Sequence, residues 1–140
     1  MINKLSLLRY LWVSPNTLLG LTFVPFVLLT RGNVRVVKGV VEVCGPLLAW
    51  LLRHCIPLSG GASAITLGHV VLARDRHSLA STRAHERVHV QQYERWGPAF
   101  IPVYLIAAMW GLATGAGAYY GNVFEREALR VEQALLDGER

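Results

Sequence analysis

The stretch His85-Glu86-Arg87-Val88-His89 places two histidines four residues apart, with a glutamate directly after the first. Residues four apart lie on one face of an α-helix, so both imidazoles can point at the same metal ion. Glu86 would then lie beside that ion, within reach of a metal-bound water, where a general base is needed. The stretch therefore predicts a helix that carries a metal centre. The alternative is a helix with two solvent-facing histidines.

The helix that carries this motif is predicted to run from about Leu79 to Trp96. The Gly-Pro pair at 97–98 ends it, because neither residue continues a helix well. Ser78 or Ser81 is the predicted N-cap, since a serine hydroxyl can accept a hydrogen bond from a backbone N–H of the first turn.

Other elements follow from apolar periodicity and turn residues. They are a β-hairpin over 34–43 that turns at Lys38-Gly39, a short helix over 47–54, a loop over 56–64, a third strand over 65–73, a charge-free helix over 100–120 and a final helix over 123–136. Together they predict an α+β fold, mostly helical, with a small antiparallel sheet of about three strands.

The composition indicates contact with a membrane or a very apolar core. Of the 140 residues 53% are hydrophobic and 16% are charged, whereas about a quarter are charged in an ordinary soluble domain. Residues 10–30 carry no charge and are numerous enough to cross a bilayer, but Pro15 and Pro25 interrupt them. We expect a single domain with an apolar segment at 1–31 and a core at 32–140. The segment is either a membrane anchor, an embedded hairpin or a buried element. Membrane association is expected, with a cytoplasmic location as the alternative.

The charges and cysteines exclude two classes of function. The net charge is +5, but the basic residues are scattered rather than clustered, so nucleic-acid binding is not expected. Cys44 and Cys55 form no metal-binding pair and are predicted to be two buried thiols.

A catalytic zinc site needs three protein ligands and an open position for water, so the two histidines require a partner. The candidates for this third ligand are Glu125, Glu127, Glu132, Glu94, Asp75, His69 and His77. Glu125 is preferred because it opens a predicted helix in a Glu-x-x-Ala pattern that ends at Ala128.

The motifs at 85–89 and 125–128 together resemble those of a compact gluzincin-type zinc metallopeptidase, and the pattern H-E-x-x-H-x-x-Q resembles small bacterial proteins of that kind. The resemblance covers roughly residues 65–135. It implies a minimal zincin-like domain in which the two histidines and Glu125 bind Zn²⁺ and Glu86 is the general base. The implied reaction is hydrolysis of a peptide or protein substrate. The alternative function is a non-catalytic, membrane-associated or metal-binding scaffold.

Several further side chains are candidates for supporting roles. Gln92 could hydrogen-bond to a metal ligand and so hold it in position, although an exposed polar residue is the preferred interpretation. His77, Tyr93, Tyr119 and Tyr120 could donate hydrogen bonds to a developing oxyanion, or could be packing residues.

The assignment of Glu125 depends on the path of residues 100–120. If they fold back beside the motif helix, Glu125 returns to the histidines. If they cross a bilayer while the motif helix lies in water, Glu125 and the histidines are on opposite sides. A bilayer-spanning segment and the Glu125 assignment are compatible only if the motif helix is itself embedded in the membrane. The preferred arrangement is a glycine-rich helix packed against the motif helix.

Overall fold

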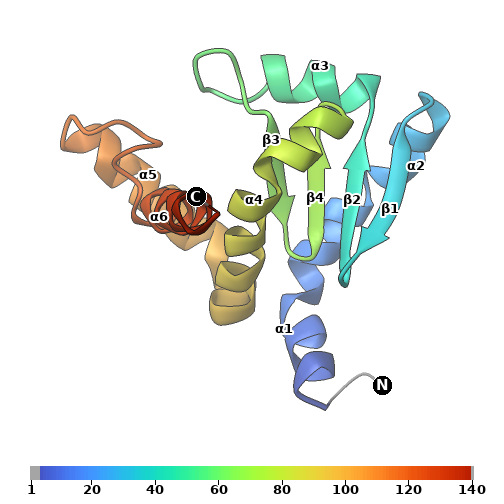
Figure 1. Ribbon diagram of the computed structural model, residues 1–140, viewed down its shortest axis with the longest axis horizontal. Helices are drawn as coiled ribbons and strands as arrows, with labels where there is room; N and C mark the ends of the chain where they lie inside the picture. Colours follow the sequence, from blue (N-terminus) through green and yellow to red (C-terminus); the bar gives the residue numbers. More distant parts are fainter. Residues whose placement is uncertain (1–3, 140) are drawn as a thin grey trace.

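The structure, a computed structural model, describes residues 4–139 and consists of a four-stranded sheet with helices around it (Figure 1). The elements in chain order are α1 (Lys4–Leu21), α2 (Val24–Leu29), β1 (Asn33–Val37), β2 (Val40–Cys44), α3 (Pro46–His54), β3 (Ala64–Leu67), β4 (Val70–Ala73), α4 (Arg76–Trp96), the 3₁₀ turn η1 (Gly97–Ala99), α5 (Phe100–Ala113) and α6 (Val123–Gly138). The predicted α+β class, mostly helical with a small sheet, is confirmed.

The sheet has the order β1-β2-β4-β3, in which β2 and β4 are parallel and the two outer pairs are antiparallel. The prediction of one strand over 65–73 is wrong, because the chain reverses at Gly68-His69 and forms the hairpin β3–β4. Gly68 has a φ of 63°, a left-handed conformation that glycine adopts without steric cost. The sheet therefore has four strands and one parallel pair, not about three strands that are all antiparallel.

The predicted hairpin around Lys38-Gly39 is confirmed as β1–β2, with Val37 opposite Val40. Lys38 and Gly39 both have positive φ, as a two-residue hairpin turn requires. The prediction of two buried thiols is confirmed for Cys44 and wrong for Cys55. Cys44 is buried in β2, but Cys55 is exposed because it follows the end of α3.

Helices cover both faces of the sheet. Leu79 and Val90 of α4 belong to one core cluster with Val71 of β4. Val27 of α2 and Leu48 of α3 belong to a second cluster that includes alternate residues of the strands. Strand β4 is buried along its whole length, which explains why it has an unbroken apolar sequence.

The motif helix α4 begins earlier than predicted, and its N-cap is neither Ser78 nor Ser81. The carboxylate of Asp75 accepts a hydrogen bond from the backbone N–H of Ser78 at 2.7 Å, so the helix begins at Arg76. A carboxylate is an effective cap because it satisfies a free N–H and interacts favourably with the helix dipole. The predicted end at Trp96 is confirmed.

The chain folds back after α4. Helix α5 covers only residues 100–113, and a turn with left-handed Gly115 and Gly117 leads to α6. The side chain of Asn122 caps α6 by accepting a hydrogen bond from the N–H of Phe124 at 3.0 Å. Helix α6 packs against α4, which is the arrangement that the assignment of Glu125 required.

The N-terminal helix α1 contacts the body along one side. Val13, Asn16 and Gly20 are buried, and most of its other side chains are exposed. Two helical segments, Lys4–Leu29 and Arg76–Ala113, are long and apolar enough to cross a membrane, which is weak support for membrane insertion.

Candidate metal centre

Two helices bring three potential metal ligands together. His85 and His89 lie one turn apart on α4, and Glu125 lies in the first turn of α6. The Nε2 atoms of the two histidines are 3.2 Å apart, and the Glu125 carboxylate lies 3.0 Å from His85 Nε2 and 3.3 Å from His89 Nε2. All three side chains are buried, and they form a group that could hold a metal ion.

The spacing of these atoms suits a small divalent ion. A tetrahedral zinc site with bonds of about 2.0–2.1 Å places its ligand atoms about 3.3–3.4 Å apart. The three distances of 3.0 to 3.3 Å are close to that value. Hydrogen bonds have a similar length, so the same geometry also allows shared protons among the three side chains.

Glycines near the end of α5 and in the turn before α6 allow the close approach that positions Glu125. A Cβ atom on Gly111 would lie 2.3 Å from the carbonyl oxygen of Gly117, and one on Gly121 would lie 2.6 Å from the Cα of Gly111. The end of α5 can therefore approach the start of α6 only because these residues lack side chains. Asn122 strengthens this contact, because its Nδ2 donates to the carbonyl of Tyr104 at 3.3 Å.

The charges of the three groups are coupled. Burial would raise the pKa of the Glu125 carboxyl, but hydrogen bonds from His85 and His89 hold it well below its ordinary range. Burial would lower the pKa of His89, but its hydrogen bond to Glu125 and the nearby carboxylates raise it to about 8. The same contacts raise the pKa of His85. A metal ion that binds here must displace these protons.

Gln92 is buried completely, so the preferred interpretation of an exposed polar residue is wrong. Its Nε2 donates to the carbonyl of Phe124 at 3.0 Å and to Glu127 at 2.8 Å, so its Oε1 is the atom 2.8 Å from His89 Nδ1. This oxygen accepts the Nδ1 proton of His89 and leaves Nε2 directed at Glu125. Such a contact fixes the tautomer and orientation of a metal-binding histidine.

His85 has an equivalent contact on its outer side. Its Nδ1 lies 3.4 Å from Glu132 of α6. Glu132 was one of the candidates for the third ligand, but it approaches the nitrogen that faces away from Glu125. Both histidines therefore present Nε2 to the centre of the group and use Nδ1 for support.

Glu86 is held in place by a residue of the sheet. The Thr66 hydroxyl of β3 donates to Glu86 Oε2 at 2.6 Å. Burial raises the pKa of the Glu86 carboxyl above its ordinary value, against the opposing effects of His89 and of the bond from Thr66. Raised carboxyl pKa values are typical of groups that exchange protons during catalysis.

Sequence reasoning missed the residues that contact the two glutamates. Thr66 was read only as part of a strand. Tyr104 lay in a charge-free helix, yet its hydroxyl donates to Glu125 Oε1 at 2.5 Å. The one available signal was its place on the inner stripe of α5, four residues after the buried Phe100. Tyr119 stacks on the His85 ring at a centroid distance of 6.3 Å.

Three predicted supporting residues do not join the group. His77 is exposed in the first turn of α4, and Tyr120 is 72% exposed. Tyr93 is buried, and its hydroxyl donates to the carbonyl of Thr66 at 3.0 Å.

The remaining third-ligand candidates have other partners. Asp75 caps α4, Glu94 pairs with His69 at 3.1 Å, and Glu127 pairs with Gln92 and with Arg95.

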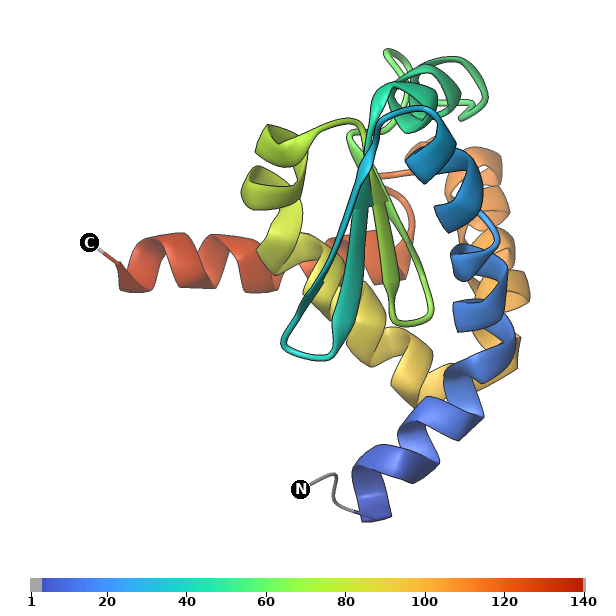
Figure 2. The same ribbon diagram turned by 90° about the vertical axis from the view of Figure 1, so that its right-hand side faces the viewer.

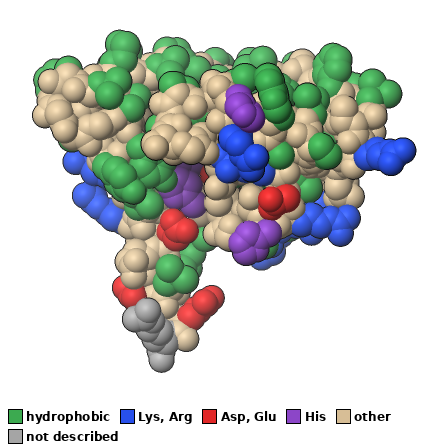
Figure 3. All heavy atoms as spheres, turned by 90° about the horizontal axis from the view of Figure 1, so that it is seen from above, with side chains coloured by type: hydrophobic (Ala, Val, Ile, Leu, Met, Phe, Trp, Pro, Cys, Tyr) green, Lys and Arg blue, Asp and Glu red, His purple; other side chains and the backbone are tan. Residues whose placement is uncertain are grey.

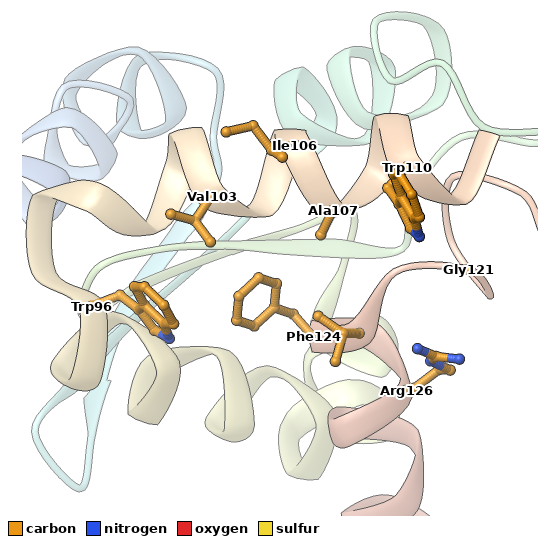
Figure 4. A pocket seen from close by; sticks show the side chains of 9 residues that line it. Trp96, Val103, Ile106, Ala107, Trp110, Gly121, Phe124 and Arg126 are labelled. Carbon is orange, nitrogen blue, oxygen red and sulfur yellow. The ribbon is translucent and has the colours of Figure 1, made fainter. Parts of the chain in front are cut away.

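An apolar hollow of about 520 Å³ lies on the other side of Phe124, between α5 and α6 (Figure 4). Its walls include Val103, Ala107 and Trp110, and Arg126 lies at one end. The histidines do not line this hollow.

Comparisons of the chain with protein-family models, with curated proteins and with solved structures produced no match.

Proposed function

We propose that the protein is a zinc-dependent peptide hydrolase in which His85, His89 and Glu125 hold the metal. The observation that carries this proposal is the spacing of the three ligand atoms, 3.0 to 3.3 Å, although Glu125 is forty residues from His85 in the chain. Imidazole and carboxylate are the ligands of catalytic zinc sites that have three protein ligands. The supporting contacts of His89 and His85 through Nδ1 are those expected behind such ligands.

Glu86 is the proposed general base. Bound zinc would supply a water of lowered pKa and polarise the scissile carbonyl. The Glu86 carboxylate would accept a proton from the attacking water and return it to the leaving amine. Its burial and its hydrogen bond from Thr66 restrict its orientation, and its raised pKa suits a group that must both accept and return a proton.

A second candidate is a metal-binding scaffold without turnover. It is favoured by the burial of the ligands, since His85 and His89 are each only 7% exposed. A substrate carbonyl would need access that side chains such as Tyr119, stacked on His85, restrict.

One substitution separates the two candidates. Purified Glu86→Gln protein is expected to keep one zinc per chain by elemental analysis and to lose about 10²–10⁴-fold in turnover of fluorogenic peptides. Glu94→Gln makes the same change elsewhere on the same helix and is the control. It is expected to keep both the zinc content and the peptide turnover of the wild type. Unchanged turnover in Glu86→Gln would remove Glu86 from the mechanism. A wild-type protein that binds zinc but cuts no peptide would favour the scaffold.

We also propose that the protein works in association with a membrane. In the most apolar part of the two candidate spans, only 22% of Lys4–Leu29 and 17% of Arg76–Ala113 is buried against the rest of the protein. Core helices of soluble proteins are mostly buried, so these segments have apolar surface that the described part of the chain does not cover.

A further inference from the structure

Helices α1, α2 and α5 each have an inner stripe that packs on the body and an outer face that is apolar. The inner stripe of α5 contains Phe100 and Gly111, which are buried. Its outer face and that of the α1–α2 unit are formed by large exposed side chains, namely Leu8, Leu11, Trp12, Leu18, Leu19, Phe26, Leu28, Leu29, Leu105, Ile106, Met109, Trp110 and Leu112. We call these residues the apolar face.

The three helices lie on the same side of the molecule. In Figure 2 α1 and α2 (blue) and α5 (orange) all lie along the right-hand side, while α6 (red) projects to the left. Seen from above, hydrophobic side chains gather along one long edge, and the acidic side chains lie toward the other side (Figure 3). Soluble monomers rarely expose contiguous apolar patches larger than a few hundred Å², and larger patches mark sites of contact with a protein or a membrane.

The charged residues within α1, α2 and α5 are all basic. The first acidic residue in the chain is Glu42, and no residue between 97 and 124 is charged. Lys4 and Arg31 flank the α1–α2 unit at its two ends. Arg9 is turned toward the body, where it pairs with Glu94 at 3.4 Å. Apolar helices whose own charged residues are all basic complement a bilayer that contains anionic lipid.

Two helical segments are long and apolar enough to cross a bilayer by length and composition alone, but the length of α5 and the contacts of α1 favour another arrangement. Helix α5 has 14 residues and is about 21 Å long at 1.5 Å per residue, shorter than the ~30 Å hydrocarbon core. Polar contacts hold α1 against the body: Asn16 donates to the carbonyl of Gly97 at 2.9 Å, and the Thr17 hydroxyl accepts from the N–H of His69 at 3.0 Å. A fully inserted α1 would carry these polar groups and the Arg9–Glu94 pair into the hydrocarbon, which is costly.

We propose that the apolar face of α1, α2 and α5 docks in one leaflet of a bilayer containing anionic lipid, with the helices parallel to its surface and α6 directed into water. This inference refines the membrane association proposed above and is independent of the metal centre. The exposed Ile106 and Trp110 belong both to the apolar face and to the wall of the hollow between α5 and α6, so the lipid-facing surface continues into that hollow (Figure 4).

Flotation of the full-length protein with lipid vesicles tests the surface. The protein is expected to float with phosphatidylcholine vesicles that contain phosphatidylglycerol, and to bind pure phosphatidylcholine at least about fivefold more weakly. Leu11→Glu and Met109→Glu change exposed positions on two different helices (61% and 62% exposed). Each is expected to weaken binding about tenfold or more, because one large apolar side chain no longer enters the lipid.

Leu135→Glu is the matched control, since Leu135 is 53% exposed on α6, away from the apolar face. It is expected to change binding less than twofold, and all three variants should keep the wild-type circular dichroism and zinc content. Equal losses in the control and in the face variants would overturn the assignment of the surface. A stable dimer that does not float would show that a second copy covers it instead.

Depth-dependent quenching tests the orientation. Single-tryptophan proteins that keep only Trp12 or only Trp110 are expected to be quenched more strongly by a nitroxide near the lipid headgroup than by one near the end of the acyl chain. Stronger quenching by the deep nitroxide would show that the helices insert across the bilayer. That result would reject parallel docking but leave membrane association in place, and neither result bears on zinc binding.

Discussion

Two buried carboxylates, Glu42 of β2 and Glu125 of α6, contact different faces of helix α4 and have different partners there. Glu42 of β2 is 2% exposed and bonds to Arg83 of α4 at 2.8 Å and to Arg35 at 2.9 Å. Glu125 is 3% exposed and bonds to His85, His89 and the Tyr104 hydroxyl. Burial is nearly the same at both sites, but only the second has partners that could themselves bind a metal ion.

The difference shows that the partners of a buried carboxylate, and not its burial, distinguish a candidate metal site from a structural ion pair. Guanidinium groups stay charged at any physiological pH. The ion pair between Glu42 of the sheet and Arg83 of α4 is therefore permanent. Burial raises the pKa of the Glu42 carboxyl, but Arg83 and Arg35 together bring it below its ordinary value. Imidazoles can lose their protons and then bind a metal. The histidine cluster can therefore change its occupant, whereas the arginine cluster cannot.

The sharpest test changes one residue of the histidine cluster and, separately, the carboxylate of the arginine cluster. Glu125→Ala or His89→Ala is expected to abolish stoichiometric zinc binding, with an affinity loss of about 10³-fold or more, because two remaining ligands do not make a site. Glu42→Gln should keep one zinc per chain. Competition with a chromophoric chelator measures both, and unchanged affinity in the Glu125 and His89 variants would reject the metal centre.

Removing a supporting contact should have a smaller effect. Gln92→Ala deletes the acceptor for His89 Nδ1 and is expected to weaken zinc binding about 10–100-fold. Gln91→Ala changes the exposed neighbour on the same helix and serves as the control. Equal affinities for the two variants would mean that Gln92 has only a packing role.

The arginine cluster should contribute to stability and not to chemistry. Glu42→Gln is expected to lower the free energy of unfolding by about 2 kcal/mol at pH 7, in the range for hydrogen bonds to charged groups. Because the folded-state pKa of Glu42 is lowered, the contribution is fully present above the unfolded value near 4.5 and is lost as the pH falls through the folded value. Urea titrations at pH 7 and pH 4 should therefore show a difference that shrinks in acid, and a constant difference would contradict the ion-pair role.

The smallest effect is expected at Thr66. Thr66→Val keeps the shape of the side chain but removes the hydrogen bond to Glu86, a bond that lowers the pKa of that carboxyl. The pKa should rise, so the acidic limb of the pH–rate profile should move to higher pH, with turnover at neutral pH falling severalfold. Replacement by serine should restore the profile, which a purely structural role for the methyl group would not predict.

Local patterns predicted most of the elements and missed those that depend on a single backbone conformation. The 3.6-residue period identified α4 and α6, and Lys38-Gly39 identified the first hairpin. The second hairpin was missed because Gly68-His69 interrupts a run of apolar residues that reads as one strand. The cap of α4 was misplaced because Asp75, Ser78 and Ser81 are all good caps, and only the path of the chain after β4 selects Asp75.

The sequence by itself determined that His85 and His89 share a face and that Glu86 lies beside them, because i to i+4 spacing on a helix is a local property. It also limited the third ligand to a few acidic or imidazole side chains. Only the tertiary structure decided among them. Glu125 reaches the histidines because α5 ends after 14 residues and closely packed glycines let α6 return. The roles of Gln92, Tyr104 and Thr66 depend on contacts between segments distant in the chain, and no local periodicity encodes such contacts.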